Sequence, residues 1–301
     1  MRIVIALGGN ALLQKGQSAE AHIQRQNILV AARAIAEVAK GNELVITHGN
    51  GPQIGLLALQ AESYHELSPY PLDVLGAESE GMLGYLIEQA LMNTLPMRDV
   101  VALLTQVLVD REDSAFEHPS KPIGPFYPLT EKHRLTDQNN WVLAEFEHGL
   151  RRLVPSPEPK KVLELAAIEL LVARGMIVVC GGGGGIPVVR DASGSLSGVA
   201  AVVDKDLTSA LLATALNADV LLLLTDVDAV YSGWGKPQAQ PITQVTVEEL
   251  GTLSFEPGTM APKIEAACRF VGSGQGCAYI GDVNQVSQIL AGKNGTKIVK
   301  Y

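Results

Sequence analysis

The sequence lacks the features of several large protein classes. Its three cysteines, Cys180, Cys268 and Cys277, have no metal-ligand spacing and cannot all pair, which favours reduced thiols in a cytoplasmic protein. No signal-peptide pattern follows Met1, and no apolar run reaches the roughly 18 residues of a membrane-spanning helix. The 23 basic side chains are outnumbered by 32 acidic ones, a net charge of −9. We therefore expect neither nucleic acid nor a membrane as the main partner.

Four common active-site motifs are also absent. Without Gly-x-x-x-x-Gly-Lys-Ser/Thr there is no Walker-type phosphate loop, and without Gly-x-Gly-x-x-Gly after a strand, dinucleotide binding is not expected. The sequence contains neither His-Glu-x-x-His nor Gly-x-Ser-x-Gly, which argues against a metalloprotease and a serine hydrolase.

The apolar pattern that is present predicts an α/β fold. The 301 residues are 47% hydrophobic and 18% charged, which suits a well-packed globular chain. Short apolar runs alternate with helical periodicity, as in a mostly parallel sheet covered by helices. The run Val220–Leu224 is apolar throughout, which predicts a strand buried on both faces. Strands are expected at 2–7, 43–47, 99–104, 176–180 and 219–224, and helices at 20–40 and 159–174.

Residues 110–159 interrupt this alternation. They hold seven of the sixteen prolines and show little clean periodicity. Such a stretch is either a functional insertion or a disordered loop. Because its aromatic residues could form a small core of their own, we expect a folded excursion that could act as a lid.

Three glycine-rich segments follow expected strands: Gly8-Gly9-Asn10, Gly49-Asn50-Gly51-Pro52 and Gly181–Gly185. Ligands of α/β proteins bind at the carboxyl ends of strands, where glycines let backbone amides approach an anion. Each loop alone could equally be a tight turn, but three at one edge favour a phosphate cradle. His48 is interpreted as an orienting residue and receives no chemical role.

Three lysines stand in unusual contexts. Lys205 lies between two aspartates at the start of a predicted helix, Lys263 opens another helix, and Lys121 lies in the proline-rich excursion. A lysine at a helix N-terminus opposes the helix dipole, although each one alone could be a solvated surface residue. Because phosphoryl transfer needs positive charge around the transferring group, we predict transfer between an adenine nucleotide and a small anionic acceptor.

Thr225–Tyr231 directly follows the most apolar strand. Its carboxylates suit an orienting or magnesium-linked role beside phosphates, and Val230 with Tyr231 could pack against an adenine ring. An Asx turn that closes the strand is the alternative, and the local sequence does not decide between them.

Together these segments resemble the carbamate kinases of the amino-acid kinase superfamily. Ala6 and Leu7 stand where many members of the superfamily carry a lysine, an absence that carbamate kinases share. Two positions depart from the family pattern, Ala261 in place of glycine and Leu150 in place of an aromatic residue. The matching segments are Val4–Ala11, His48–Gln53, Lys121–Tyr127, Arg151–Pro157, Gly181–Pro187, Val203–Leu207, Thr225–Tyr231, Gly258–Lys263 and Gly295-Thr296.

The resemblance implies a homodimeric three-layer α/β/α sandwich with a protruding subdomain. The enzyme would interconvert ATP plus carbamate with ADP plus carbamoyl phosphate, with Mg²⁺ held by the nucleotide phosphates and no metal ligand from the protein. The single domain 1–301 would comprise a substrate lobe at about 1–200, with the subdomain at about 110–155, and a nucleotide lobe at about 201–301.

The resemblance also implies roles for individual residues. Carbamate is already an anion, so no general base is required. A kinase of another small carboxylate, or a catalytically weak sensor of nucleotide or carbamoyl phosphate, remains an alternative. The implied catalytic residues are Lys121, Lys205, Asp206 and Lys263, with Asp206 holding the lysines. The implied phosphate and substrate cradle is Gly8, Gly9, Asn10, Gly49, Asn50, Gly51, Gly182 and Gly183. The implied nucleotide residues are Asp226, Val230, Tyr231, Met260 and Lys263.

Overall fold

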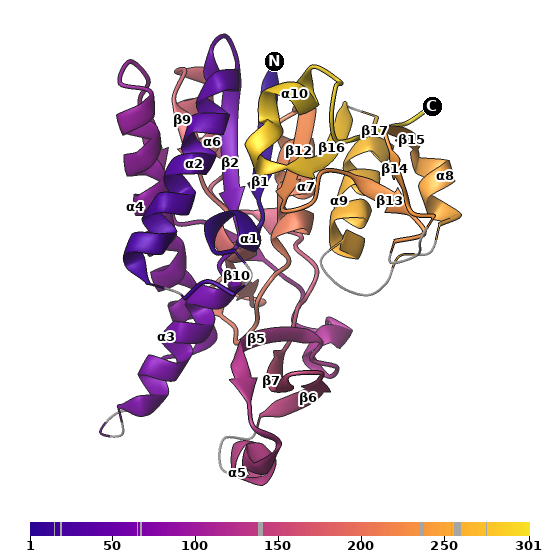
Figure 1. Ribbon diagram of the computed structural model, residues 1–301. Coiled ribbons are helices and arrows are strands. Elements are labelled where there is room, and N and C mark those ends of the chain that lie inside the picture. The colour runs from indigo at the N-terminus through magenta and orange to yellow at the C-terminus, as the bar shows by residue number, and fades with distance from the viewer. Residues whose placement is uncertain are drawn as a thin grey trace.

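The computed structural model describes residues 1–14, 16–18, 20–64, 66, 68–137, 141–234, 238–253, 255, 260–274 and 276–301, without the side chains of Asn10 and Ala11 (Figure 1). Among these residues an eight-stranded sheet forms the centre, in the order β15-β17-β16-β12-β1-β2-β9-β3. Its neighbouring strands are parallel except β16 and β17. The strands are β1 (Arg2–Leu7), β2 (Glu43–His48), β3 (Val100–Ala102), β9 (Ile177–Val179), β12 (Val220–Thr225), β15 (Gln244–Thr246), β16 (Cys277–Asp282) and β17 (Thr296–Val299).

Helices cover both faces of this sheet, which makes a three-layer sandwich (Figure 1). Side chains alternate along a strand, so Ile3 and Ile5 enter the core beneath one helical layer while Val4 enters the core beneath the other. Val220–Leu224 alternates in the same way, which confirms that β12 is buried on both faces. One layer contains α2 (Ala21–Ala39), α4 (Leu72–Thr94) and α10 (Val286–Leu290), and the other contains α6 (Leu165–Ala173), α7 (Lys205–Ala215) and α9 (Met260–Gly272).

The expected strands and the helix at 20–40 are confirmed with small shifts at their ends. The helix expected at 159–174 is wrong in its first turn and a half, because α6 begins only at Leu165. Lys161 and Val162 instead form β8, which pairs with β4 (Gln106–Leu108) in a second sheet. The predicted end is correct, since Gly175 adopts a left-handed conformation (φ 80°) directly after the helix. The second sheet also contains β10 (Ile186–Arg190) and β11 (Leu196–Gly198).

The proline-rich excursion forms a small sheet that projects from the main body (Figure 1). Its strands are β5 (Lys121–Tyr127), β7 (Gly149–Val154) and β6 (Val142–Phe146), and α5 (Lys132–Asp137) lies at its tip. Of the aromatic residues expected to form a core, Trp141 is buried against Arg152, whereas Phe126 and Phe146 are largely exposed. We call residues 121–154 the subdomain.

The root of the subdomain packs on α3 (Gly51–Ser63). Ile123 and Val154 share a small core with Ile54 of that helix. The backbones meet so closely that a methyl group at Gly55 would overlap Gly124. The position of Lys121, at the start of β5, is therefore determined by contacts with the main body.

Candidate active site

Helix α7 begins beside the carboxyl ends of the central strands. Asp204 is its N-cap: one oxygen, Oδ1, accepts hydrogen bonds from the backbone amides of Asp206 (2.9 Å) and Leu207 (3.4 Å). Such a cap satisfies amides that the helix itself leaves unpaired. It places Lys205 in the first helical position, as the sequence predicts.

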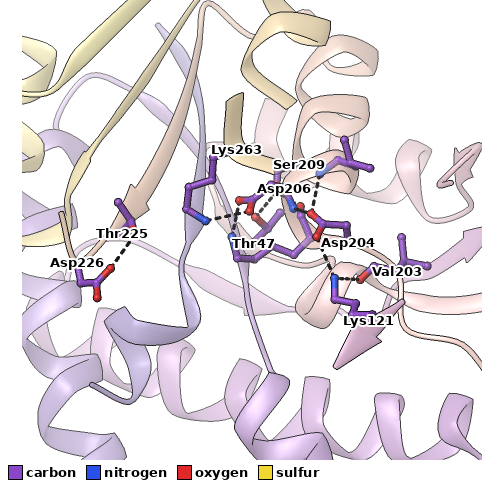
Figure 2. Close-up of polar contacts among 11 residues, drawn as sticks. Thr47, Lys121, Val203, Asp204, Asp206, Ser209, Thr225, Asp226 and Lys263 are labelled. Atoms are coloured by element: carbon purple, nitrogen blue, oxygen red, sulfur yellow. Dashed lines mark hydrogen bonds and ion pairs between the residues drawn. The ribbon is translucent and has the colours of Figure 1, made fainter. Parts of the chain in front are cut away.

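Asp206 joins two helices through its side chain. Its Oδ1 accepts from Lys205 Nζ (2.5 Å), and its Oδ2 accepts from Lys263 Nζ (3.0 Å), 57 positions later in the chain (Figure 2). Lys263 lies in the first turn of α9, which begins at Met260. All three side chains are less than one-tenth exposed. Both ammonium groups oppose a helix dipole, and the shared carboxylate compensates for that placement.

The charges in this cluster depend on one another. Burial would raise the pKa of Asp206, but the Lys205 and Lys263 ammonium groups outweigh burial and hold it well below its usual value. Burial lowers the pKa of Lys205 to about 8, although Asp206 acts in the opposite direction. The cluster therefore retains positive charge in a buried position, which favours binding of an anion.

The third predicted lysine, Lys121, does not contact Asp206. Its Nζ donates to Asp204 Oδ2 (2.9 Å) and to the carbonyl of Val203 (3.3 Å), as Figure 2 shows. Asp204 therefore connects the subdomain with the start of α7. No role is predicted for Asp204 from the sequence, although its place immediately before a helix is a signal for a cap.

Two glycine loops meet beside Lys205. A methyl group at Gly49 would lie 3.2 Å from Gly9 N and 3.5 Å from Lys205 Cε. A methyl group at Gly8 would lie 2.7 Å from the carbonyl oxygen of Leu224. Glycine is therefore required at Gly8 and favoured at Gly49 by close backbone approach. The side chain of Asn10 lies outside the described residues.

The third glycine loop lies against the second. Gly183 has a left-handed backbone (φ 67°), and a methyl group there would overlap the Asn50 side chain. Asn50 Nδ2 donates to Ser79 Oγ (2.7 Å). Gly51 begins α3, and Gly182 lies in the short turn Gly182–Gly184. The structure thus brings all three loops together, while their role toward a ligand stays a prediction.

Glu80 of α4 supports this arrangement, and the sequence analysis missed it. Its two carboxyl oxygens accept from the backbone amides of Gly182 (2.8 Å) and Thr105 (3.2 Å). Burial raises the pKa of Glu80 to about 8. An acidic residue in a long helix is usually interpreted as exposed.

His48 also lies against Gly182, because a methyl group at Gly182 would overlap both the His48 ring and the Glu80 side chain. Its Nδ1 pairs with the Gly49 carbonyl (3.1 Å), and its buried Nε2 has no hydrogen-bond partner within the described part of the chain. Burial lowers its pKa to about 4. The ring is therefore neutral at pH 7.

The residues predicted to bind nucleotide differ in burial and in surroundings. Asp226 accepts from Thr225 Oγ1 (3.0 Å) and lines a cavity of about 330 Å³ that is bordered by Asn27 and Asp282. Val230 is buried in the core, whereas Tyr231 is half-buried and stacks edge-on with Trp234 (5.2 Å between centroids). Met260 is half-buried at the start of α9, and Gly258 and Thr259 lie outside the described residues.

Neither a metal cluster nor a membrane span is found in the described residues. They contain no group of three or more His, Cys, Asp and Glu side chains that could hold a metal ion. No described helix combines the length and the apolar character needed to cross a bilayer.

Comparison with known proteins places this arrangement in a family. The profile of the amino acid kinase family matches residues 1–282. The chain belongs to the amino acid kinase family. Family members similar to this chain include carbamate kinase of Haemophilus influenzae, which is 49% identical over 301 residues. The matched region covers 100% of this chain and 97% of the relative. Carbamate kinase of Pyrococcus horikoshii is 43% identical over 310 residues, covering 99% and 98%.

A solved structure of another family member supports the same conclusion. Carbamate kinase from Giardia lamblia bound to AMP-PNP superposes with a TM-score of 0.92 at 38% identity, covering 100% of this chain and 98% of that one. The family resemblance and the fold class expected from the sequence are confirmed.

Proposed function

We propose that this protein is a carbamate kinase, which reversibly transfers a phosphoryl group between ATP and carbamate. The observation that carries the proposal is the pair of buried lysines on one carboxylate, next to the meeting point of the Gly8–Gly9 and Gly49 loops. The family members described above are named carbamate kinases, and their similarity to this chain extends over nearly their whole length.

In this proposal the lysines act on charge rather than on protons. Lys205 and Lys263 donate N–H groups to the oxygens of the transferring phosphoryl group, where negative charge is spread in the transition state. Asp206 keeps both ammonium groups oriented and favours the protonated form of Lys205. The attacking oxygen of carbamate is already anionic, so no residue needs to remove a proton from it. The glycine loops supply backbone amides to the substrate, and Lys121 adds a third cation.

Mg²⁺ would enter with the nucleotide in this proposal. Both oxygens of Asp206 accept from lysines, and both oxygens of Asp204 are hydrogen-bonded. The carboxylates of Asp206 and of the neighbouring Asp204 are therefore occupied, which fits a cation held by phosphate oxygens. When bound, Mg²⁺ would neutralise phosphate charge. Asp226, Tyr231 and Met260 are proposed to serve the nucleotide.

We also propose a homodimer that works in the cytoplasm. Helix α4, which contacts the edge strand β3, carries exposed apolar side chains, including Met82, Tyr85 and Met92, and these support association with a second copy. The three thiols are unpaired, as suits a reducing compartment. Sedimentation that gives a mass near 31.9 kDa, that of one chain, would contradict the dimer.

A coupled assay tests the activity. The purified protein should make ATP from ADP and carbamoyl phosphate, and the reaction should stop when EDTA removes divalent ions. Acetyl phosphate serves as the alternative donor. Faster ATP formation from acetyl phosphate would indicate a kinase of another carboxylate, and no ATP from either donor would contradict the proposed function.

A further inference from the structure

Asp204 divides its carboxylate between two parts of the molecule. Oδ1 caps α7 through the amides of Asp206 and Leu207, while Oδ2 accepts from Lys121 of the subdomain (2.9 Å). Asp204 and Lys121 are far apart in the chain, at a separation of 83 positions. The side chain thus directs the ammonium group of the subdomain toward the start of the helix that carries Lys205.

The contact leaves Lys121 with a remaining donor. An ammonium group has three N–H donors, and those of Lys121 reach Asp204 Oδ2 and the Val203 carbonyl. No third acceptor is recorded for it among the described residues. The side chain is 27% exposed, so it is held in place without being sealed from solvent. Two hydrogen bonds fix its direction, and the remaining N–H can meet an anionic ligand.

The surroundings preserve the charge of Asp204. Burial would raise the pKa of this carboxyl, but its interactions with the Lys121 and Lys205 ammonium groups together hold it below its usual value. Asp206 opposes ionisation of Asp204, whereas Lys205 favours it. Val203, the second acceptor of Lys121, lies against Gly184, because a methyl group at Gly184 would be 2.5 Å from the Val203 carbonyl oxygen. The contact therefore lies where the subdomain, α7 and the third glycine loop meet.

We propose that Asp204 is a positioning residue, which aims the ammonium group of Lys121 at the substrate phosphoryl group while it holds the start of α7. This inference rests on the proposed function for its substrate, carbamoyl phosphate. It goes beyond that function because it gives Asp204, which lies outside the lysine–Asp206 cluster, control over the subdomain cation. An inhibitory contact, in which Asp204 keeps Lys121 from the substrate, makes the opposite kinetic prediction.

Asp204→Asn separates the two tasks of the side chain. Asparagine caps a helix about as well as aspartate, so α7 should keep its start, whereas the charged partner of Lys121 is lost. A hydrogen bond between charged groups is worth about 10- to 100-fold in an equilibrium. We expect kcat/KM for carbamoyl phosphate to fall by about that factor, with the KM for ADP changed by less than about twofold. The exposed Asp191→Asn, which removes the same charge in the β10–β11 turn, is the control.

A double-mutant cycle distinguishes positioning from a structural role. In a Lys121→Ala background, Asp204→Asn should cause no further loss, because the group it positions is absent. Loss of the same factor in both backgrounds would overturn the proposal, as would an Asp204→Asn enzyme whose kcat/KM is unchanged or raised.

A measurement without substrate keeps the test independent of the proposed function. Hydrogen exchange of the β5 amides in the ligand-free protein should accelerate about tenfold or more in Asp204→Asn, with α7 protection retained. Unchanged hydrogen exchange of the β5 amides would contradict the proposal that Asp204 positions Lys121. If the wild type makes no ATP, the proposed function fails, while the exchange result still decides whether Asp204 holds Lys121.

Discussion

The side chain of Glu80 accepts a hydrogen bond from the backbone amide of Gly182, 102 positions later in the chain (2.8 Å). Its other oxygen accepts from the amide of Thr105 (3.2 Å). The preceding residue, Ser79, accepts from Asn50. Two adjacent residues of α4 therefore hold the second and third glycine loops in their places.

The raised pKa of Glu80 predicts a pH-dependent stability. Its pKa rises from 4.5 to about 8 on folding, so this group destabilises the protein progressively as the pH rises through that interval. The lowered pKa of His48, from 6.5 to about 4, has the opposite effect only below pH 6.5. Between pH 6.5 and 8 the free energy of unfolding should therefore fall by about 2 kcal/mol from Glu80.

Urea unfolding at several pH values measures this effect. Glu80→Gln, which cannot titrate, should lose the slope between pH 6.5 and 8, whereas Glu78→Gln on the exposed face of the same helix should keep it. An identical slope in wild type and Glu80→Gln would show that Glu80 does not bind a proton on folding.

Lys205→Met should lower the maximal rate far more than it weakens nucleotide binding. Removal of one preorganised donor to developing charge typically costs about 100- to 1000-fold in rate. Steady-state kinetics give the rate, and calorimetric titration with ADP gives the affinity. Equal losses in both would show that Lys205 is a ground-state binding group.

The rate should also decline at alkaline pH. Burial lowers the pKa of Lys205 to about 8, so the required ammonium form is lost as the pH rises through that value. The profile of kcat/KM for carbamoyl phosphate reports this ionisation in the free enzyme. Because Asp206 raises the pKa of Lys205, Asp206→Asn should shift the alkaline limb to lower pH. A limb that stays in place would assign it to another group.

The close approach of α3 to β5 predicts unequal effects of two helix glycines. A methyl group at Gly55 would overlap Gly124 Cα, so Gly55→Ala should push β5 and Lys121 outward and destabilise the protein by about 1–3 kcal/mol. Gly76→Ala in α4 meets no atom within 4 Å and should be neutral or stabilising by up to about 1 kcal/mol.

Thermal unfolding and the coupled assay together check this prediction. Gly55→Ala should lower both the melting temperature and the turnover rate, while Gly76→Ala should lower neither. Full activity in Gly55→Ala would show that the position of β5 tolerates displacement.

Local patterns were sufficient to predict the strands of the sheet and to select Lys205 and Lys263 as candidate site residues. The apolar run Val220–Leu224 predicts a doubly buried strand, and the glycines after strands predict loops at one edge of the sheet. Lys205 and Lys263 are conspicuous because each opposes a helix dipole. The start of α6 was missed because Leu163 continues its apolar stripe, while Val162 pairs with Val107 of a distant strand.

The sequence by itself determined the layered fold and the family, because these depend on periodicity and on short contiguous segments. The tertiary structure shows the hydrogen bonds of Asp206 to both lysines that the family resemblance implies, and it alone decided that Asp204 holds Lys121 and that Glu80 holds Gly182. These partners are brought together by sheet order and helix packing, and no local pattern records distances between residues 57 to 102 positions apart. A carboxylate becomes a lasting partner for a lysine or an amide when folding brings the two groups together and shields them from bulk water.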